Sequence, residues 1–560
     1  MAFMMQCFTS LLRECGVVST SLAELWIISL LAAYMLMLIF IKLQLNSRRS
    51  KQQHKLPPGP SPWPIVGNML QANDLPHRWF AKLASQYGPI LYLYMGSNPY
   101  VIVNNAEMAK EALKTRDADF ASRPRSMFGE VISFGYEDMV FRSSDAKWRA
   151  LRKLCASNLF TPTGMKTFTA VRQEEMLSMV SSVHSSAKGC SVINIKRVIY
   201  EANVNSMCRI LFGKKYLRAV PQLDLEAKNF LDLLDRIVSE SGQINLGDFI
   251  PALQWLDLQG AEKRLKNDMK QALEKFFYPV LAENRKLRDE QGGETIKEGE
   301  AKNFLDVLQS FEGEESFSDK SIAGILCNLI LAGTDTTSVT VEWAFSELLA
   351  NPHILRKAQE EIDSVVGYQR VVQESDLLNL PYLQAIVKET LRMHPALPLG
   401  IPHYNSATTH LGGYTIPAGS TLLVNIWAIA QDPASWSNPT QFNPDRFLGS
   451  DIQLVGQQFQ LIPFSAGRRH CLGYPLVLVQ VPHILATLLQ AFDWSLPAGQ
   501  RPEDINMQEK VGLSCYRAVP LELLVSERLP TINNTLNLYE NMDHTQQYTE
   551  HKLSELSVQG

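Results

Sequence analysis

The loop around Cys471 constrains this chain of 560 residues more than any other stretch. Gly467 can adopt a backbone turn with positive φ, and Gly473 leaves space beside the sulfur. Phe464 can keep water away from the sulfur, while the basic run at 468–470 is expected to lower the thiol pKa and favour the thiolate. A dry thiolate as the only protein ligand suits a haem iron that cleaves an O–O bond. The alternative is a buried structural cysteine beside a solvated basic turn.

The pattern Phe464-x-x-Gly467-x-Arg469-x-Cys471-x-Gly473 resembles the haem-binding signature of the cytochrome P-450 monooxygenases at every fixed position. The resemblance extends from about residue 56 to about residue 525, and it is closest to plant microsomal members. It implies the mainly α (α+β) cytochrome P-450 fold: a large helical domain with a small β region, preceded by one N-terminal transmembrane helix. It also implies haem b (iron protoporphyrin IX), with Cys471 on the iron and with Phe464, Arg469 and Gly473 beside the cofactor.

The composition is that of a globular protein, with 46% hydrophobic and 20% charged residues. The net charge of -4 argues against a nucleic-acid partner. The 8 cysteines are scattered without CxxC pairs, which indicates neither a zinc site nor a disulfide framework. Their pattern fits a reducing compartment.

Residues 25–41 form an uncharged apolar run that is long enough to span a bilayer core. A cleaved signal peptide or a buried helix is the alternative, but Glu24 precedes the run and no A-x-A-like site follows it. Basic residues follow at 42, 48, 49, 51 and 55, so the positive-inside rule places the rest of the chain in the cytosol. Five prolines within 55–64 favour a stiff spacer over an SH3-type ligand.

These features predict one large domain within a longer chain. The predicted order is a lumenal N-terminus (1–24), a transmembrane anchor (25–41), a basic and proline-rich hinge (42–64), a haem-thiolate monooxygenase domain (65–525) and a polar, disordered tail (526–560). The predicted location is the endoplasmic reticulum membrane, single-pass, with the catalytic domain in the cytosol.

Two stretches near the start of the domain carry structural signals. Residues 91–95 and 100–103 are predicted to pair as a β-hairpin. The loop 120–136 contains five apolar residues, Met127, Phe128, Val131, Ile132 and Phe134. In the resembling family this loop covers the substrate pocket, so these side chains are expected to face a hydrophobic ligand; otherwise they are ordinary core residues.

Trp148 and Arg152 are four residues apart on a predicted helix, so they share one face. An indole N–H and a guanidinium suit a carboxylate, and in the resembling family such a pair donates to a haem propionate. The alternative is a surface cation–π pair. Arg149 and Lys153 point elsewhere and could dock an acidic redox partner.

A long helix is predicted from Ser318, a plausible N-cap, to about residue 350. Gly333 and three threonines lie in its middle, where propensity disfavours them, which is typical of a functional site. The stretch resembles the family's oxygen-activating segment. By that resemblance Gly333 makes room for the flat cofactor, and Asp335 and Thr336 supply protons for O–O cleavage. The structural alternative is a bent helix with satisfied hydroxyls.

Glu389 and Arg392 lie three apart on a predicted helix at 382–393. Alone this spacing is weak, but in the family the two would form a buried triad with Arg446 that serves folding and haem retention. Asp445 stands where the family motif more often has glutamate. His403 stands where many members have a propionate-binding arginine, and a histidine can donate a similar hydrogen bond.

After the cysteine a helix is predicted from about Gly473 to Gln490. Pro482 lies in its interior, where it should cost about 3 kcal/mol or kink the helix. Residues 412–425 are predicted to form strand, turn and strand.

The resemblance implies a haem-dependent monooxygenase that inserts one atom of O₂ into a small organic substrate and releases the other as water. Electrons would come from an NADPH-dependent flavoprotein reductase in the same membrane. Stretches 412–432 and 506–520 resemble members that hydroxylate flavonoids and other phenylpropanoids, which favours an aromatic substrate. The alternatives are a fatty-acid hydroxylase, a haem-thiolate isomerase or dehydratase that does not use O₂, and a non-catalytic haem protein.

Overall fold

The computed structural model describes residues 55–189, 191–216, 225–290, 303–311, 316–533 and 536; before residue 55 it describes only residues 29, 30, 33, 34 and 37. The chain divides into two units, one of residues 1–57 and 413–415 and the other of residues 58–412 and 416–560. The predicted anchor, 25–41, lies outside the described residues except for those five positions, which are helical. The second unit holds the cysteine loop and the other predicted site residues.

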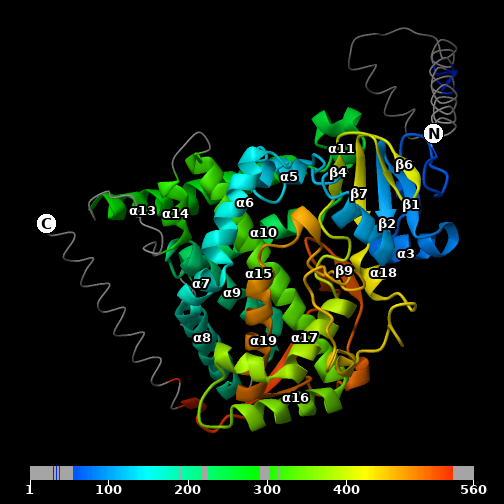
Figure 1. Cartoon of the computed structure of the whole chain (residues 1–560). Coiled ribbons are helices and arrows are strands. Elements are labelled where there is room, and N and C mark those ends of the chain that lie inside the picture. Colours follow the sequence, from blue (N-terminus) through cyan, green and yellow to red (C-terminus); the bar gives the residue numbers. More distant parts are fainter. Residues whose placement is uncertain are drawn as a thin grey trace. The chain divides into compact units, whose positions relative to one another are not determined.

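Helices make up most of the second unit (Figure 1), as the sequence predicts. In chain order the α-helices are α3 (Pro76–Tyr87), α4 (Ala106–Lys110), α5 (Met127–Ile132), α6 (Ala146–Leu159), α7 (Pro162–Thr167), α8 (Thr169–Lys188), α9 (Ile195–Phe212), α10 (Leu225–Ser241), α11 (Leu246–Phe249), α12 (Ala261–Ala272), α13 (Tyr278–Glu290), α14 (Phe304–Ser310), α15 (Asp319–Ala350), α16 (Pro352–Val365), α17 (Pro381–Met393), α18 (Ile426–Ala430) and α19 (Tyr474–Ala491). Short 3₁₀ or π turns lie between them: η1 (Met69–Gln71), η2 (Glu111–Thr115), η3 (Pro251–Leu256), η4 (Leu273–Phe277), η5 (Glu374–Asn379), η6 (Pro444–Phe447), η7 (Gly467–Arg469) and η8 (Pro502–Asp504).

The strands form small sheets. They are β1 (Ile90–Met95), β2 (Asn98–Val103), β3 (Ile193–Asn194), β4 (His403–Asn405), β5 (Thr409–Leu411), β6 (Tyr414–Ile416), β7 (Ser420–Val424), β8 (Phe492–Ser495), β9 (Glu509–Val511), β10 (Cys515–Arg517) and β11 (Glu522–Glu527). One sheet has the order β1-β2-β7-β4, in which β1 and β2 form the predicted antiparallel hairpin, β7 runs parallel to β2 and β4 is antiparallel to β7. Two further sheets are β3-β11-β8 and the pair β10-β9.

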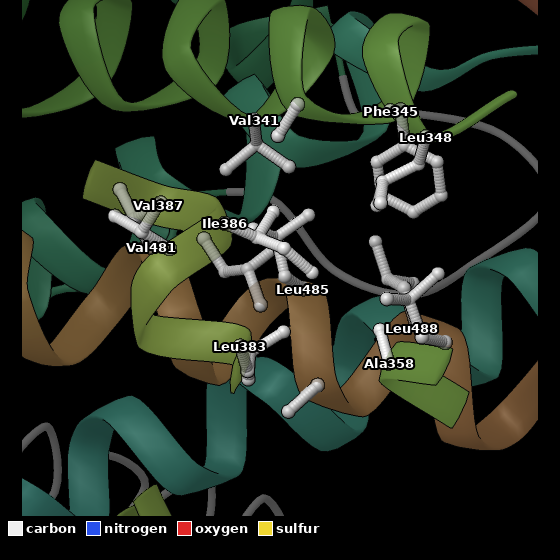
Figure 2. Close-up of a cluster of buried hydrophobic side chains, with 14 of the residues drawn as sticks. Val341, Phe345, Leu348, Ala358, Leu383, Ile386, Val387, Val481, Leu485 and Leu488 are labelled. Atoms are coloured by element: carbon white, nitrogen blue, oxygen red, sulfur yellow. The ribbon is translucent and has the colours of Figure 1, made fainter. Parts of the chain in front are cut away.

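The long helix α15 forms the middle of the hydrophobic core. Val341, Phe345 and Leu348 recur at helical spacing and are fully or almost fully buried. Val341 lies over Ile386 of α17 and Leu485 of α19, whereas Phe345 and Leu348 lie over Leu488 of α19 (Figure 2). A helix that is apolar around most of its circumference is a buried helix, so the sequence pattern and the packing agree.

The ends of α15 are where the sequence predicts them. The Ser318 side chain accepts a hydrogen bond from the Ser321 N–H at the N-terminus, and Pro352 begins the next helix. The hydroxyls of Thr334 and Thr336 each donate to the carbonyl four residues earlier, at 2.7 Å. These bonds satisfy the hydroxyls without interrupting the helix, which is continuous from Asp319 to Ala350.

Two helices within the described residues, α15 and α19, are long and apolar enough to cross a membrane. Within the protein, however, 83% of the most apolar stretch of α15 and 72% of that of α19 are buried. Both helices also carry side chains of the same core cluster. Their apolar character is explained by this packing.

Pro482 lies inside α19 without ending the helix. A proline there removes the N–H that would donate to the carbonyl of residue 478. Leu478 is 39% exposed, so water can reach this side of the helix and the carbonyl need not be buried without a donor. The Pro482 ring itself is buried.

The loop 120–136 differs from its predicted role. Met127, Val131 and Ile132 lie on the short helix α5 and are buried in a hydrophobic cluster, with Phe128 and Phe134 packed against it. None of these residues lines the cavity described below. From this region Arg123, near the start of the loop, and Met139 and Val140, which follow it, line the cavity.

The packed domain extends beyond the predicted boundary at residue 525. That boundary falls inside β11, and Leu529, Ile532 and Leu536 are buried in the same core cluster as α15. The sequence after β11 therefore contributes apolar side chains to the domain, and the prediction that the tail begins at 526 is wrong. Residues 537–560 lie outside the described residues.

Candidate active site

One cavity brings together segments that are far apart in the sequence. Its walls include the cysteine loop from Pro463 to Gly473, the middle of α15 and the stretch 396–403 before β4. Of the predicted residues, the cavity is lined by Arg152, Gly333, Thr336, His403, Phe464, Arg469, Cys471 and Gly473. Trp148 and Asp335 are close to these residues but do not line the cavity.

Cys471 is a free cysteine with its side chain exposed at the cavity. Burial by the surrounding protein raises the pKa of its thiol, whereas the backbone N–H groups of Gly473 and Tyr474 and the Arg152 guanidinium lower it. The expectation that the basic run 468–470 lowers this pKa is therefore wrong. The favourable charge comes from α6, and the favourable N–H groups come from the start of α19.

The turn before the cysteine is held in one shape. Gly467 has a φ of 70°, and a Cβ on it would lie 2.0 Å from the carbonyl oxygen of Leu113, so only glycine fits. The Cys471 N–H donates to the Phe464 carbonyl at 3.0 Å. A Cβ on Gly473 would first meet the Cys471 sulfur, at 3.8 Å. The positive φ predicted for Gly467 is confirmed, whereas the space at Gly473 would also admit a Cβ in ordinary contact with the sulfur.

Arg469, a basic residue of the loop, is held by contacts with other segments of the chain. Arg469 donates to three carbonyls: from Nε to Ala121 at 2.7 Å, from Nη1 to Met139 at 3.3 Å and from Nη2 to Arg142 at 2.5 Å. Its guanidinium also lies 4.1 Å from the ring centroid of Trp148. Arg469 therefore holds the cysteine loop against the chain on both sides of α5, at Ala121 before it and at Met139 and Arg142 after it.

Trp148 supports this contact and does not face the cavity. Its indole N–H donates to the Met139 carbonyl at 3.0 Å, and its side chain is 3% exposed. Arg152, one turn further along α6, is 5.5 Å from the same ring. The pair shares a helix face as predicted, but only Arg152 lines the cavity.

Two arginines keep donors available at the cavity. Arg152 uses Nη2 to donate to the His470 carbonyl at 2.7 Å. Arg123 donates from Nε to the Val140 carbonyl and from Nη1 to the carbonyls of residues 401–402. Within the described residues, Nε and Nη1 of Arg152 and Nη2 of Arg123 donate no hydrogen bond. Sequence reasoning missed Arg123; the Arg-Pro step that opens the loop at 123–124 was the available signal.

His403 is buried and neutral. Its Nδ1 lies 3.0 Å from the Phe120 carbonyl, so Nδ1 carries the proton and donates. Burial, together with the Arg123 charge, lowers the pKa of His403 to about 3. In the neutral ring Nε2 is an acceptor, so the hydrogen-bond donor toward an anion at this wall is Arg123 and not His403.

The middle of α15 presents small and hydroxylated residues to the cavity. Gly333, Thr336 and Thr337 line it, whereas Thr334 is fully buried elsewhere. A Cβ on Gly333 would lie 2.9 Å from the sulfur of Met207, so this glycine also permits close packing against α9. Thr336, the threonine that the family resemblance selects, therefore lies at the cavity, as does Thr337.

Asp335 points to the other side of α15. It is 1% exposed, and its Oδ2 accepts hydrogen bonds from the Ser514 hydroxyl at 2.6 Å and the Tyr516 hydroxyl at 2.8 Å. Its Oδ1 lies 3.9 Å from the Lys196 ammonium. Burial raises the pKa of Asp335, and Lys196 and the two hydroxyls act against that rise.

The predicted triad is assembled away from the cavity. Glu389 accepts from Arg392 at 2.7 and 2.9 Å, from Arg446 Nε at 3.0 Å and from the Asn443 N–H at 2.8 Å. The side chains of Glu389 and Arg392 are both 0% exposed. Asp445, the departure from the family motif, lies on the surface and pairs with Lys357 at 2.6 Å.

A second group of potential metal ligands lies outside the cavity. One ligand atom each of His77, Glu509 and Cys515 lie within 4.8 Å of one another. The Glu509 carboxylate is already bonded to His77 at 3.1 Å and to Arg78 at 2.6 Å. Because its charge is balanced by these groups, we treat the cluster as an ion pair of the fold.

The family model for Cytochrome P450 matches residues 57–519. This chain belongs to the cytochrome P450 family. Its fold is likewise that of solved P450 structures: a zebra fish cytochrome P450 in a structure with progesterone superposes with a TM-score of 0.70 and 29% identity, covering 81% of this chain and 100% of that chain.

This chain aligns with several curated relatives from plants over almost their full length. Flavonoid 3'-monooxygenase of Arabidopsis thaliana is 39% identical over 520 residues, 91% of this chain and 98% of the relative. The enzyme of the same name from Petunia hybrida is 40% identical over 492 residues, 86% and 94%. Iridoid oxidase of Catharanthus roseus is 37% identical over 509 residues, 88% and 96%. The chain is thus a P450 monooxygenase, a haem-thiolate enzyme that uses a redox partner and acts on a small organic molecule.

The cavity fits the P450 haem by the chemistry of its walls. Burial and the neighbouring Arg469 lower the pKa of Arg123 to about 9, and burial and the neighbouring Arg152 lower that of Arg469 to about 10. Arginines that are close together and have free N–H donors favour the binding of an anion. Haem carries two anionic propionates. The sulfur of Cys471 and the apolar Leu476 and small Ala332 line the same space, as an iron-bearing flat ring requires.

Proposed function

We propose that this P450 hydroxylates a flavonoid-type aromatic substrate at the endoplasmic reticulum membrane. The observation that carries the catalytic part is the cavity that has Cys471 and Thr336 on its walls together with unengaged donors of Arg123 and Arg152. The substrate class is supported by the flavonoid 3'-monooxygenases of two plants at about equal identity.

Cys471 is the residue that would hold the haem iron. Burial raises the pKa of its thiol, but the N–H groups of Gly473 and Tyr474 act against that rise, because a thiolate gains more from them than a thiol does. Arg152 and Arg123 would bind the propionates through their free guanidinium N–H groups. When bound, the haem supplies the oxidative chemistry; the protein orients the substrate and controls protons.

Proton control falls to α15. Thr336 presents its side chain to the cavity, where its hydroxyl can hold a water molecule close to the site of oxygen chemistry. Asp335 is adjacent in sequence and reaches the opposite side of the helix, so it can exchange protons with groups behind the cavity wall. Loss of such general acid assistance typically costs about 10² to 10⁴ in rate.

The membrane and redox parts rest on the sequence. Residues 25–41 would anchor the chain, with the catalytic domain in the cytosol. An NADPH-dependent flavoprotein reductase in the same membrane would supply electrons. Deleting residues 1–50 should release the haem-loaded protein from membranes, and protease added outside sealed microsomes should digest the domain; a protected domain would reverse this topology.

The substrate proposal is tested by adding flavonoids that lack a 3'-hydroxyl, and separately fatty acids, to the purified haem protein and recording the Soret band. We expect a shift with flavonoids at micromolar concentration and, with reductase and NADPH, a product that carries one more hydroxyl at the 3' position. Thr336→Val is the matched control: it should give the same Soret shift with less product. A Soret shift and a product obtained with fatty acids alone would contradict the proposal.

A further inference from the structure

A buried polar cluster lies behind the cavity wall, on the face of α15 that turns away from the cysteine loop. Asp335 forms its centre. Ser514 and Tyr516, from the end of the chain, donate to the same oxygen, Oδ2. Lys196 and Tyr200 approach from α9. The cluster joins three parts of the sequence around one carboxyl group.

The two carboxylate oxygens of Asp335 have different partners. Oδ2 accepts from both hydroxyls, which fixes the rotamer of the side chain. Oδ1 faces the Lys196 ammonium at 3.9 Å. Lys196 is the member of this cluster closest to solvent, with 28% of its side chain exposed, and its Nζ lies 4.0 Å from the Tyr516 ring centroid. Tyr516 therefore contacts both Asp335 and Lys196.

We propose that Ser514 and Tyr516 are positioning residues for Asp335, and that protons reach Asp335 from solvent through Lys196. This inference rests on the proposed proton role of Asp335 and names the side from which the proton comes. A proton passes from Lys196 Nζ to Asp335 Oδ1, through one water or a small side-chain movement that closes the gap. Lys196 then takes a proton from solvent, so its charge is restored.

The electrostatics of the cluster are consistent with an acid that exchanges its proton. Burial raises the pKa of Asp335, while Lys196, Ser514 and Tyr516 favour its charged form. Asp235 of α10 acts in the opposite direction on Asp335. Of the other titratable groups nearby, burial raises the pKa of Glu342, about two turns further along α15, and that of Tyr200, and the charge of Asp335 adds to both rises.

The test uses the haem-loaded full chain and an infrared readout that does not depend on turnover. The carbonyl band of protonated Asp335 is assigned as the band missing in Asp335→Asn and is followed against pH. Tyr516→Phe removes one hydrogen bond from the charged form of Asp335. The midpoint of the pH titration of this band should therefore rise by about one to two pH units. Ser514→Ala should act in the same direction and serves if Tyr516→Phe does not fold. Tyr200→Phe is the matched control, because Tyr200 donates no hydrogen bond to Asp335 among the described contacts, and its midpoint should not move.

Lys196 is tested by the solvent deuterium isotope effect on NADPH-driven product formation. Lys196→Met should increase that effect several-fold, and Lys196→Arg should restore it, because arginine keeps the charge and donors. An unchanged infrared midpoint in both Tyr516→Phe and Ser514→Ala would refute the positioning role. An unchanged isotope effect in Lys196→Met would refute the proposal that protons reach Asp335 through Lys196. Neither result concerns the proposed proton role of Asp335 itself, which fails separately if Asp335→Asn forms product with unaltered coupling to NADPH.

Discussion

Replacing Glu389 by glutamine should destabilise the domain through the loss of one buried charge. The substitution keeps the size of the side chain but removes the carboxylate that accepts from Arg392 and Arg446. Because Arg392 is 0% exposed, its charge is left in the interior without an anion. Breaking a buried pair in this way typically costs about 3–5 kcal/mol.

That free energy converts into a modest shift of the melting temperature. At about 2.1 cal/mol/K per residue, a domain that covers residues 57–519 unfolds with an entropy near 1 kcal/mol/K, so Glu389→Gln should lower Tm by about 3–5 °C. Scanning calorimetry at one fixed scan rate measures this change, since large domains often unfold irreversibly.

A matched control lies next to the triad. Asp445 pairs with Lys357, but the two side chains are 57% and 47% exposed, so Asp445→Asn should change Tm by less than about 1 °C. The double variant Glu389→Leu with Arg392→Met should be more stable than Glu389→Gln, because it leaves no unpaired charge on Arg392. The reasoning is refuted if Glu389→Gln melts within 1 °C of the unaltered protein, as the surface variant is expected to do.

Three further predictions concern the cavity and the pH dependence of stability. Cys471→His should remove the red-shifted absorption that a thiolate-bound haem gives when reduced with CO; a retained band would mean that another cysteine binds the iron. Thr336→Val should lower product formed per NADPH while peroxide accumulates, and Thr334→Val, which is buried elsewhere, should do so less; equal effects would remove the special role of Thr336. Burial alone would raise the pKa of Glu509, but hydrogen bonds from His77 and Arg78 lower it from 4.5 to about 2. Its contribution of about 3 kcal/mol is therefore present above pH 4.5 and lost as the pH falls toward 2, and Glu509→Gln should flatten that part of a plot of Tm against pH.

Local patterns were sufficient to predict much of this fold. The bounds of α15 follow from an N-cap at Ser318 and from Pro352, and both signals act within one turn of the helix end. The turn at residue 467 could be predicted because glycine is the residue type that accepts a positive φ there without strain. In each case the cause lies in neighbouring residues, so the sequence alone displays it.

Contacts between distant segments were beyond the same reasoning. Arg469 is adjacent to a basic residue and a histidine, which suggested an effect on the thiol, but its donors are taken by carbonyls at 121, 139 and 142. Asp335 is adjacent to Thr336 in sequence, but α-helical geometry separates neighbours by 100°, and its partners Ser514 and Tyr516 come about 180 residues later. The sequence patterns around Arg469 and Asp335 do not indicate these partners.

The three arginines that line the cavity, Arg123, Arg152 and Arg469, link cofactor binding to the stability of the domain. Arg123 and Arg469 have pKa values lowered by burial and by neighbouring arginines, which means that the fold holds their charges at a cost. Arg469 offsets part of this cost by donating to three carbonyls, whereas Arg123 and Arg152 retain donors that no described residue accepts. An anion bound there would satisfy these donors and reverse the repulsion, so its binding free energy also stabilises the folded state. The haem propionates would therefore hold together α6, the cysteine loop and the segment before β4, which enclose the cavity together with the middle of α15.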